Sequence, residues 1–182
     1  MRKRRFVRAV ALAALVGAAG FAFLLYRADQ PGGIDDVYTA AFGPPDLGDV
    51  AFETLVRRSS PNDALACPPD LCAAPVDFET PTFDVPGARL REIVREVAAA
   101  EPGTELVYSA RWAEVDRFVA RSALMRYPDT INAHVFGAGP GRSQLALYSR
   151  SQIGHSDLGV NRARLERWLA EIARRVAAEA GS

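Results

Sequence analysis

Apolar and polar residues alternate with two different periods in the second half of the chain, and each period predicts one kind of element. Two apolar stripes recur at helical spacing. The first stripe consists of Leu90, Ile93, Val94 and Val97, and the second of Leu165, Trp168, Leu169, Ile172 and Val176. The first helix is expected to begin near Pro86 and to end before Pro102-Gly103. The second stripe predicts a long helix at the C-terminal end of the sequence.

A two-residue period predicts strands between these helices. The β-prone segments cover residues 104–109, 114–122, 130–136 and 144–151, and residues 82–85 are expected to form a first strand. Because the links between the later strands are short, neighbouring strands should pair antiparallel. The expected order is β-α-β-β-β-β-α over residues 81–179. This order predicts an α+β fold in which an antiparallel sheet of about four to five strands carries helices on one face.

The first 27 residues have a different character. A basic cluster, Arg2 to Arg5 with Arg8, precedes an uncharged run from Ala9 to Tyr26. At about 1.5 Å per residue, a helix of this length spans roughly 27 Å, which suffices for a hydrocarbon core. Since Lys and Arg stay cytoplasmic, the pattern predicts a single-pass anchor with the domain outside the cytoplasm, in the periplasm. The alternative is a signal peptide cleaved after Gly20, which would leave an apolar stub on the mature chain.

Residues 28–80 show little periodicity and are expected to form an irregular lead-in, with a short strand or helix near residues 50–56. Proline and glycine clusters at 43–45, 59–61 and 68–69 interrupt this segment. It also holds the only two cysteines, Cys67 and Cys72. Outside the cytoplasm such a close pair favours a disulfide; unpaired thiols and a redox or metal role are the alternatives.

Charge narrows the range of functions. Residues 1–27 carry six basic residues and no acidic one, so the remainder has sixteen basic against twenty-two acidic residues. An acidic domain of this kind argues against non-specific nucleic-acid binding, which depends on neutralising phosphates. With two histidines and no further cysteine cluster, the sequence predicts no metal site and no cofactor.

The segment from Tyr148 to Arg162 is dense in polar side chains directly before the last helix. Ser156, Asp157 or Asn161 can cap that helix. A second interpretation is an anion or ligand site at the helix N-terminus. The candidate ligand-binding residues are Arg121, Arg126, Arg150, His155, Asp157 and Arg162. A catalytic triad of His155, Ser156 and Asp157 is rejected, because consecutive residues rarely face each other.

Three ordered segments resemble a known family. They cover residues 60–69, residues 118–130 and residues 149–162, and the last begins Ser149-Arg-Ser-Gln-Ile-Gly-His155. They are similar to the domain-of-unknown-function family numbered fourteen ninety-nine, found in bacteria and plastids, over about residues 60–172. The resemblance implies a compact domain, frequently behind an N-terminal hydrophobic segment. It implies no catalytic or binding residue.

Three functions are therefore compared. The first is a binding or accessory module of the cell envelope with an anionic or lipid-like ligand. The second is a hydrolase or isomerase with His155 or Asp157 as general base. The third is a structural protein that docks on a membrane-protein partner. The absence of an evident acid–base pair favours the first, and no catalytic residue is assigned.

Overall fold

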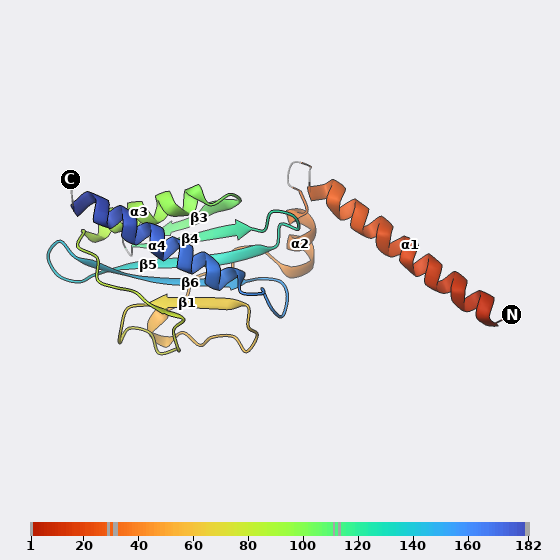
Figure 1. Cartoon of the computed structure of the whole chain (residues 1–182), viewed down its shortest axis with the longest axis horizontal. Helices are drawn as coiled ribbons and strands as arrows, with labels where there is room; N and C mark the ends of the chain where they lie inside the picture. The colour runs from red at the N-terminus through yellow and green to blue at the C-terminus, as the bar shows by residue number, and fades with distance from the viewer. Residues whose placement is uncertain (1, 29, 31–32, 111, 113, 181–182) are drawn as a thin grey trace. The chain divides into compact units, whose positions relative to one another are not determined.

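The computed structural model describes residues 2–28, 30, 33–110, 112 and 114–180. The chain forms two compact units (Figure 1). One unit contains residues 1–43 together with residues 124–126, and the other contains residues 44–123 and 127–182. The second unit contains all the strands and is called the sheet domain.

The first unit contains two helices, α1 (Arg2–Ala28) and α2 (Asp35–Phe42). The apolar stretch Phe6–Arg27 of α1 is long enough to cross a membrane, and none of it is buried inside the protein. Such a helix near the N-terminus is either a membrane anchor or a signal sequence.

The sheet domain has an α+β fold built on a six-stranded mixed sheet (Figure 1). Its elements are the 3₁₀ turn η1 (Phe52–Thr54), β1 (Asp63–Cys67), β2 (Phe78–Glu79), α3 (Gly87–Ala100), β3 (Thr104–Ala110), β4 (Val115–Arg121), β5 (Pro128–Gly137), β6 (Ser143–Ser151) and α4 (Val160–Ala180). The strand order is β2-β1-β6-β5-β4-β3. Only the edge pair β1–β2 is parallel; the other four neighbouring pairs are antiparallel.

Alternation along the strands separates two cores, as the two-residue period predicts. Ile131 and Leu145 belong to a large apolar cluster with residues of α3 and α4, so both helices pack on one face of the sheet. Ala146 and Tyr148, the neighbours on the opposite face, belong to a second and smaller cluster. Trp168 of α4 packs edge-on against Phe118 of β4, with ring centroids 5.7 Å apart.

The expected first strand over residues 82–85 is wrong. Only Phe83 pairs there, in an isolated bridge to Ser143. Pro81 and Pro86 bracket this segment, and proline cannot donate to a strand ladder. The edge of β6 is also already occupied further along by β1, which pairs Asp63 with Arg150.

The segment 28–80, which was expected to be irregular, contains α2 and the strands β1 and β2. β1 lies inside the sheet, between β2 and β6. Its residues Ala64 to Cys67 are all buried because both faces of the sheet are covered there. A short strand that is buried on both faces has no alternating pattern, so its sequence gives no strand period.

A connecting segment, residues 44–58, covers the face of the sheet opposite the helices and is called the strap. Phe52 of the strap is buried in the second apolar cluster, beside Leu65 and Tyr148. The expected short element at residues 50–56 is the turn η1. Cys67 and Cys72 form a disulfide next to this cluster, as the sequence predicted.

Candidate functional site

Four segments of the sheet domain meet at one end of the sheet. They are the residue before β1, the start of β5, the end of β6 and the first turns of α4. The polar side chains that meet there are Asn62, Asp129, Ser149, Ser151, Asn161 and Arg164, and all six are buried. The register explains the meeting, because Asp129 of β5 lies opposite Ser151 of β6.

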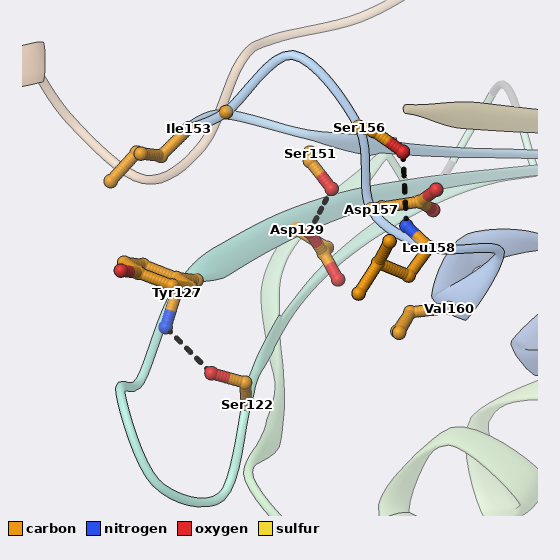
Figure 2. Close-up of a pocket in the computed structure, with 10 residues that line it drawn as sticks. Ser122, Tyr127, Asp129, Ser151, Ile153, Ser156, Asp157, Leu158 and Val160 are labelled. Carbon is orange, nitrogen blue, oxygen red and sulfur yellow. Dashed lines mark hydrogen bonds between the residues drawn. The ribbon is translucent and has the colours of Figure 1, made fainter. Parts of the chain in front are cut away.

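The centre of this cluster is an ion pair between Arg164 and Asp129, with Nη2 and Oδ2 2.9 Å apart. The other oxygen of Asp129 accepts a hydrogen bond from the Ser151 hydroxyl at 2.6 Å (Figure 2). Arg164 also donates from Nε to Glu101 at 3.0 Å. Burying a charge is costly unless it is paired and hydrogen-bonded, and here both partners meet that condition.

Asn161 connects the ion pair to β1. Its amide group donates to the carbonyl of Asn62 at 3.1 Å and to the Ser151 hydroxyl at 2.9 Å. Its side-chain oxygen accepts from Arg164 at 2.8 Å and from the hydroxyl of Ser149 at 2.5 Å. Asn62 in turn donates to the carbonyl of Gly154, at 2.8 Å. The network therefore fixes the loop that joins β6 to α4.

A cavity of about 290 Å³ lies beside this network, between the β6–α4 loop and the ends of the β4–β5 link (Figure 2). Its lining residues are Ser122, Tyr127, Asp129, Ser151, Ile153, Gly154, Ser156, Asp157, Leu158 and Val160. This volume is at the small end of known ligand sites. Most of the lining surface is apolar.

The two carboxylates in the lining are already engaged. Asp129 is held by Arg164 and Ser151, as described above. Asp157 caps α4, since its oxygens accept from the backbone N–H of Gly159 at 3.0 Å and of Asn161 at 2.8 Å. The expected capping role of this segment is confirmed, with Asp157 as the capping residue. Among the described lining residues there is no Arg, Lys or His.

Leu158 at the cavity has an unusual conformation. Its side chain is 94% exposed, and its backbone lies in the left-handed region, with a φ of 54°. That region costs a non-glycine residue roughly 1–2 kcal/mol, and an apolar side chain gains nothing from exposure to water. The loop holds this geometry through a hydrogen bond from the Leu158 N–H to the Ser156 hydroxyl at 3.3 Å (Figure 2). Strain of this kind is typical of functional sites.

The six residues predicted to bind a ligand do not form one cluster, and only Asp157 lines the cavity. Arg121 pairs with Glu105 and Arg162 with Asp77, both at 2.8 Å. His155 is exposed in the β6–α4 loop and is not in the cavity lining.

Arg150 and Arg126, two more of the predicted residues, contact segments that are remote in the sequence. Arg150 donates from Nη2 to the carbonyls of Leu47 and Gly48 in the strap, both at 2.9 Å. Burial lowers the pKa of Arg150 from its ordinary value. Arg126 belongs to the first unit and pairs with Asp35 at 3.0 Å.

The sequence did not predict that Asn62, Ser151, Asn161 and Arg164 form one hydrogen-bonded network. The family resemblance pointed to part of this network, because three of the four residues lie in the segments that resemble the family. Arg164 looks in the sequence like a solvated residue of the last helix, yet it is only 4% exposed.

No metal centre was found among the described residues, in which no three His, Cys, Asp or Glu side chains are grouped to hold an ion. Charged groups instead pair with arginines across elements. Asp116 of β4 accepts from Arg91 and Arg95 of α3, at 2.8–2.9 Å. Burial alone would raise the pKa of Asp116, but these hydrogen bonds outweigh it and lower the pKa to about 2.

An α+β domain behind an apolar N-terminal helix, with a small loop cavity over a buried polar network, describes the class of this protein. Its family follows from comparison. The model of the family described as "Protein of unknown function (DUF1499)" matches residues 56–172, and the chain belongs to this family. No curated protein matches the chain.

Proposed function

We propose that the protein is a membrane-anchored module of the cell envelope, with its sheet domain outside the cytoplasm, and that it binds a lipid-like ligand in the loop cavity. The exposed, strained Leu158 at an apolar cavity carries this proposal. A leucine in this geometry is explained when an apolar group of a ligand covers it. Ile153, Tyr127 and Val160 extend the same apolar lining.

The lining favours a lipid-like ligand over an anionic one. An anion needs cations or free N–H donors, and the described lining provides no basic side chain. The N–H groups at the start of α4 are partly used by Asp157. An acyl chain or another uncharged apolar group needs neither, and it would bury the lining from water.

The length of the apolar run and the charges around it support the anchor. Residues 6–27 suffice to cross a bilayer, and the basic residues before them favour a cytoplasmic N-terminus. A reporter that is active only outside the cytoplasm, fused after residue 182, tests the orientation. The mass of the membrane-bound chain tests retention of residues 1–27. A mature chain that begins after Gly20 would contradict the anchor.

Leu158 offers a sharp test of the cavity. Leu158→Asn removes the apolar side chain, and asparagine tolerates the left-handed backbone better than leucine does. The variant should keep or gain thermal stability and lose binding of a fluorescent monoacylglycerol. Val56→Asn is the matched control, because Val56 is also an exposed apolar residue but does not line the cavity. Equal binding by both variants would contradict the proposal.

The same assay separates the two ligand classes. Inorganic phosphate and a phosphorylated glycerol are added to the unmodified protein, and thermal unfolding is followed. The lipid-like proposal expects stabilisation by the monoacylglycerol and none by the two anions. Stabilisation by phosphate alone would favour the anionic ligand instead.

The hydrolase or isomerase alternative finds less support. A general base must reach a bound substrate, and His155 is exposed outside the cavity lining. Asp157 has both oxygens occupied as the cap of α4.

Docking on an envelope protein is favoured by one observation. β3 is the last strand of the sheet, and Glu105 to Ser109 are all exposed, including the apolar Leu106 and Val107. An exposed strand edge can pair with a strand of a partner. Val107→Lys should abolish co-purification of such a partner if this edge binds it, and unchanged co-purification would exclude the edge.

A further inference from the structure

The short helix α2 follows the proposed anchor closely. α1 ends at Ala28 and α2 begins at Asp35. A connection of this length spans at most about 25 Å when fully extended. If α1 crosses the membrane, α2 therefore lies near the membrane surface on the side where the chain emerges. This step rests on the membrane anchor proposed above.

α2 also holds the tip of the β4–β5 link, so the two form one compact unit. The hydroxyl of Tyr38 donates to the carbonyl of Met125 at 2.8 Å. Asp35 pairs with Arg126, at 3.0 Å. Ile34 and Tyr38 are buried. The tip residues Leu124–Arg126 therefore lie beside the helix that follows the anchor.

This unit exposes apolar side chains. Phe42 is 56% exposed and Leu124 is 67% exposed, and Val37 is partly exposed as well. Val37 and Phe42 lie on the two sides of the buried stripe formed by Ile34 and Tyr38, as helical spacing dictates. Such side chains gain from transfer out of water.

The charges of the unit suit a lipid surface. Asp35 and Asp36 are the acidic residues of α2, and each lies beside an arginine: Asp35 beside Arg126, and Asp36 beside Arg27 at 3.4 Å. The pairing offsets the repulsion that unpaired carboxylates would experience from anionic lipid headgroups. Arg27 closes the apolar stretch of α1, at the position where a headgroup layer is expected.

We infer that α2 and the tip Leu124–Arg126 form a docking surface for the lipid bilayer in which α1 is anchored. Phe42, Val37 and Leu124 enter the interfacial layer, and Arg27 and Arg126 stay at headgroup level. Ser122 and Tyr127, which precede and follow this tip in the chain, line the cavity. Bilayer contact and the ligand site therefore share one short link, which suits a ligand that comes from the membrane.

The test uses the full chain reconstituted in phosphatidylcholine vesicles. Trp112, which is exposed, is first replaced by phenylalanine so that the only native tryptophan is the buried Trp168. Leu124→Trp and, separately, Phe42→Trp are then introduced. Val56→Trp is the matched control in the sheet domain. Fluorescence is compared between vesicles of ordinary and brominated lipid, because bromine quenches only indoles that enter the bilayer.

The inference expects a loss of emission in brominated vesicles for Leu124→Trp and Phe42→Trp, and no loss for Val56→Trp. Equal emission of all three in both vesicles would overturn it, and so would equal quenching of all three. If instead a protein or a second copy covers this surface, the two indoles are shifted to the blue without quenching, which also overturns it. Alkaline extraction of the same vesicles tests the anchor separately: chain that is washed off refutes the anchor, whereas retained but unquenched chain refutes only the docking surface.

Discussion

The two faces of the sheet are held by different physical means. On one face, α3 and α4 bury a large apolar cluster against alternate residues of β1, β4, β5 and β6. On the other face, a few apolar residues of the strap around Phe52 pack on the sheet, and polar groups make the remaining contacts. The hydroxyl of Thr130 accepts from the N–H of Leu47 at 3.0 Å, and Asn132 donates to the carbonyl of Gly48 at 3.0 Å.

The polar residues of the second face are there to satisfy the backbone of the strap. A helix satisfies its own backbone groups, whereas an irregular segment needs partners for them. Thr130, Asn132 and Arg150 supply those partners to the strap. Arg150 therefore has a backbone-holding role that its position in a polar motif does not reveal.

The largest expected effect concerns the buried ion pair beneath the cavity. Arg164→Met leaves Asp129 buried without its cation, and removal of one partner from such a pair typically costs about 3–5 kcal/mol. The free energy of unfolding, measured by chemical denaturation, should fall by about that amount. Arg174→Met is the matched control, because Arg174 lies on the same helix and pairs with Glu171 at the surface. Its expected loss is about 0.5 kcal/mol or less.

An equal loss of unfolding free energy in both variants would show that burial of the Arg164 ion pair does not increase its contribution to stability. In that case the network around Asn161 would be a consequence of the fold and not a support for the loop. Adding Asp129→Asn to Arg164→Met should restore part of the lost stability, since the uncompensated charge is then removed.

The face covered by helices could be predicted from the sequence in some detail. The stripes of α3 and α4 and the alternation of β4, β5 and β6 are periodic, because each of these elements has one face on the core and a different environment on the other. β1 and β2 lack such a period. β1 is buried on both faces, and β2 has two residues. Their positions follow from long-range pairing, which no local pattern encodes.

The candidate site was predicted only in part. The capping role before α4 was foreseeable, because it follows from local chemistry. The dispersal of Arg121, Arg126, Arg150 and Arg162 was not, since each finds a partner that is remote in sequence. The strained Leu158 has no sequence signal at all, because a leucine between Asp157 and Gly159 does not reveal its backbone angle.

A smaller effect is expected on the strap face. Arg117 pairs with Asp46 at 2.9 Å and with Asp49, and it also covers the ring of Tyr108. Because both carboxylates are partly exposed, Arg117→Met should cost only about 1 kcal/mol. The variant should, however, exchange the amide hydrogen of Leu47 faster, since Asp46, the neighbour of Leu47 in the strap, loses its charged partner. Arg167→Met, at an exposed position of α4, should change neither quantity.

Unchanged exchange at Leu47 would mean that the apolar contacts of Phe52 and the hydrogen bonds with Thr130, Asn132 and Arg150 hold the strap without Arg117. The ion pairs of Arg117 would then contribute little to holding this face.

A separate effect is expected from acid, and it should appear on both faces. The pKa of Asp116 on the helix face is lowered to about 2, against roughly 3.9 for an unfolded aspartate. On the strap face, burial alone would raise the pKa of Asp46, but hydrogen bonds from Arg117 and from the Gly48 N–H lower it.

A carboxyl whose pKa is lower in the folded protein contributes stability that is complete above its unfolded pKa and is lost as the pH falls through its folded pKa. Unfolding free energy should therefore decline between about pH 4 and pH 2. Asp116→Asn should destabilise at neutral pH and show a shallower decline, so that its difference from the unmodified chain shrinks toward pH 2. Asp46→Asn should act in the same direction with a smaller change, because Asp46 is more exposed than Asp116. Parallel pH profiles for the unmodified chain and Asp116→Asn would contradict the lowered pKa of Asp116. A larger change in stability from Asp46→Asn than from Asp116→Asn would mean that the ion pairs on the strap face stabilise the fold more than those on the helix face.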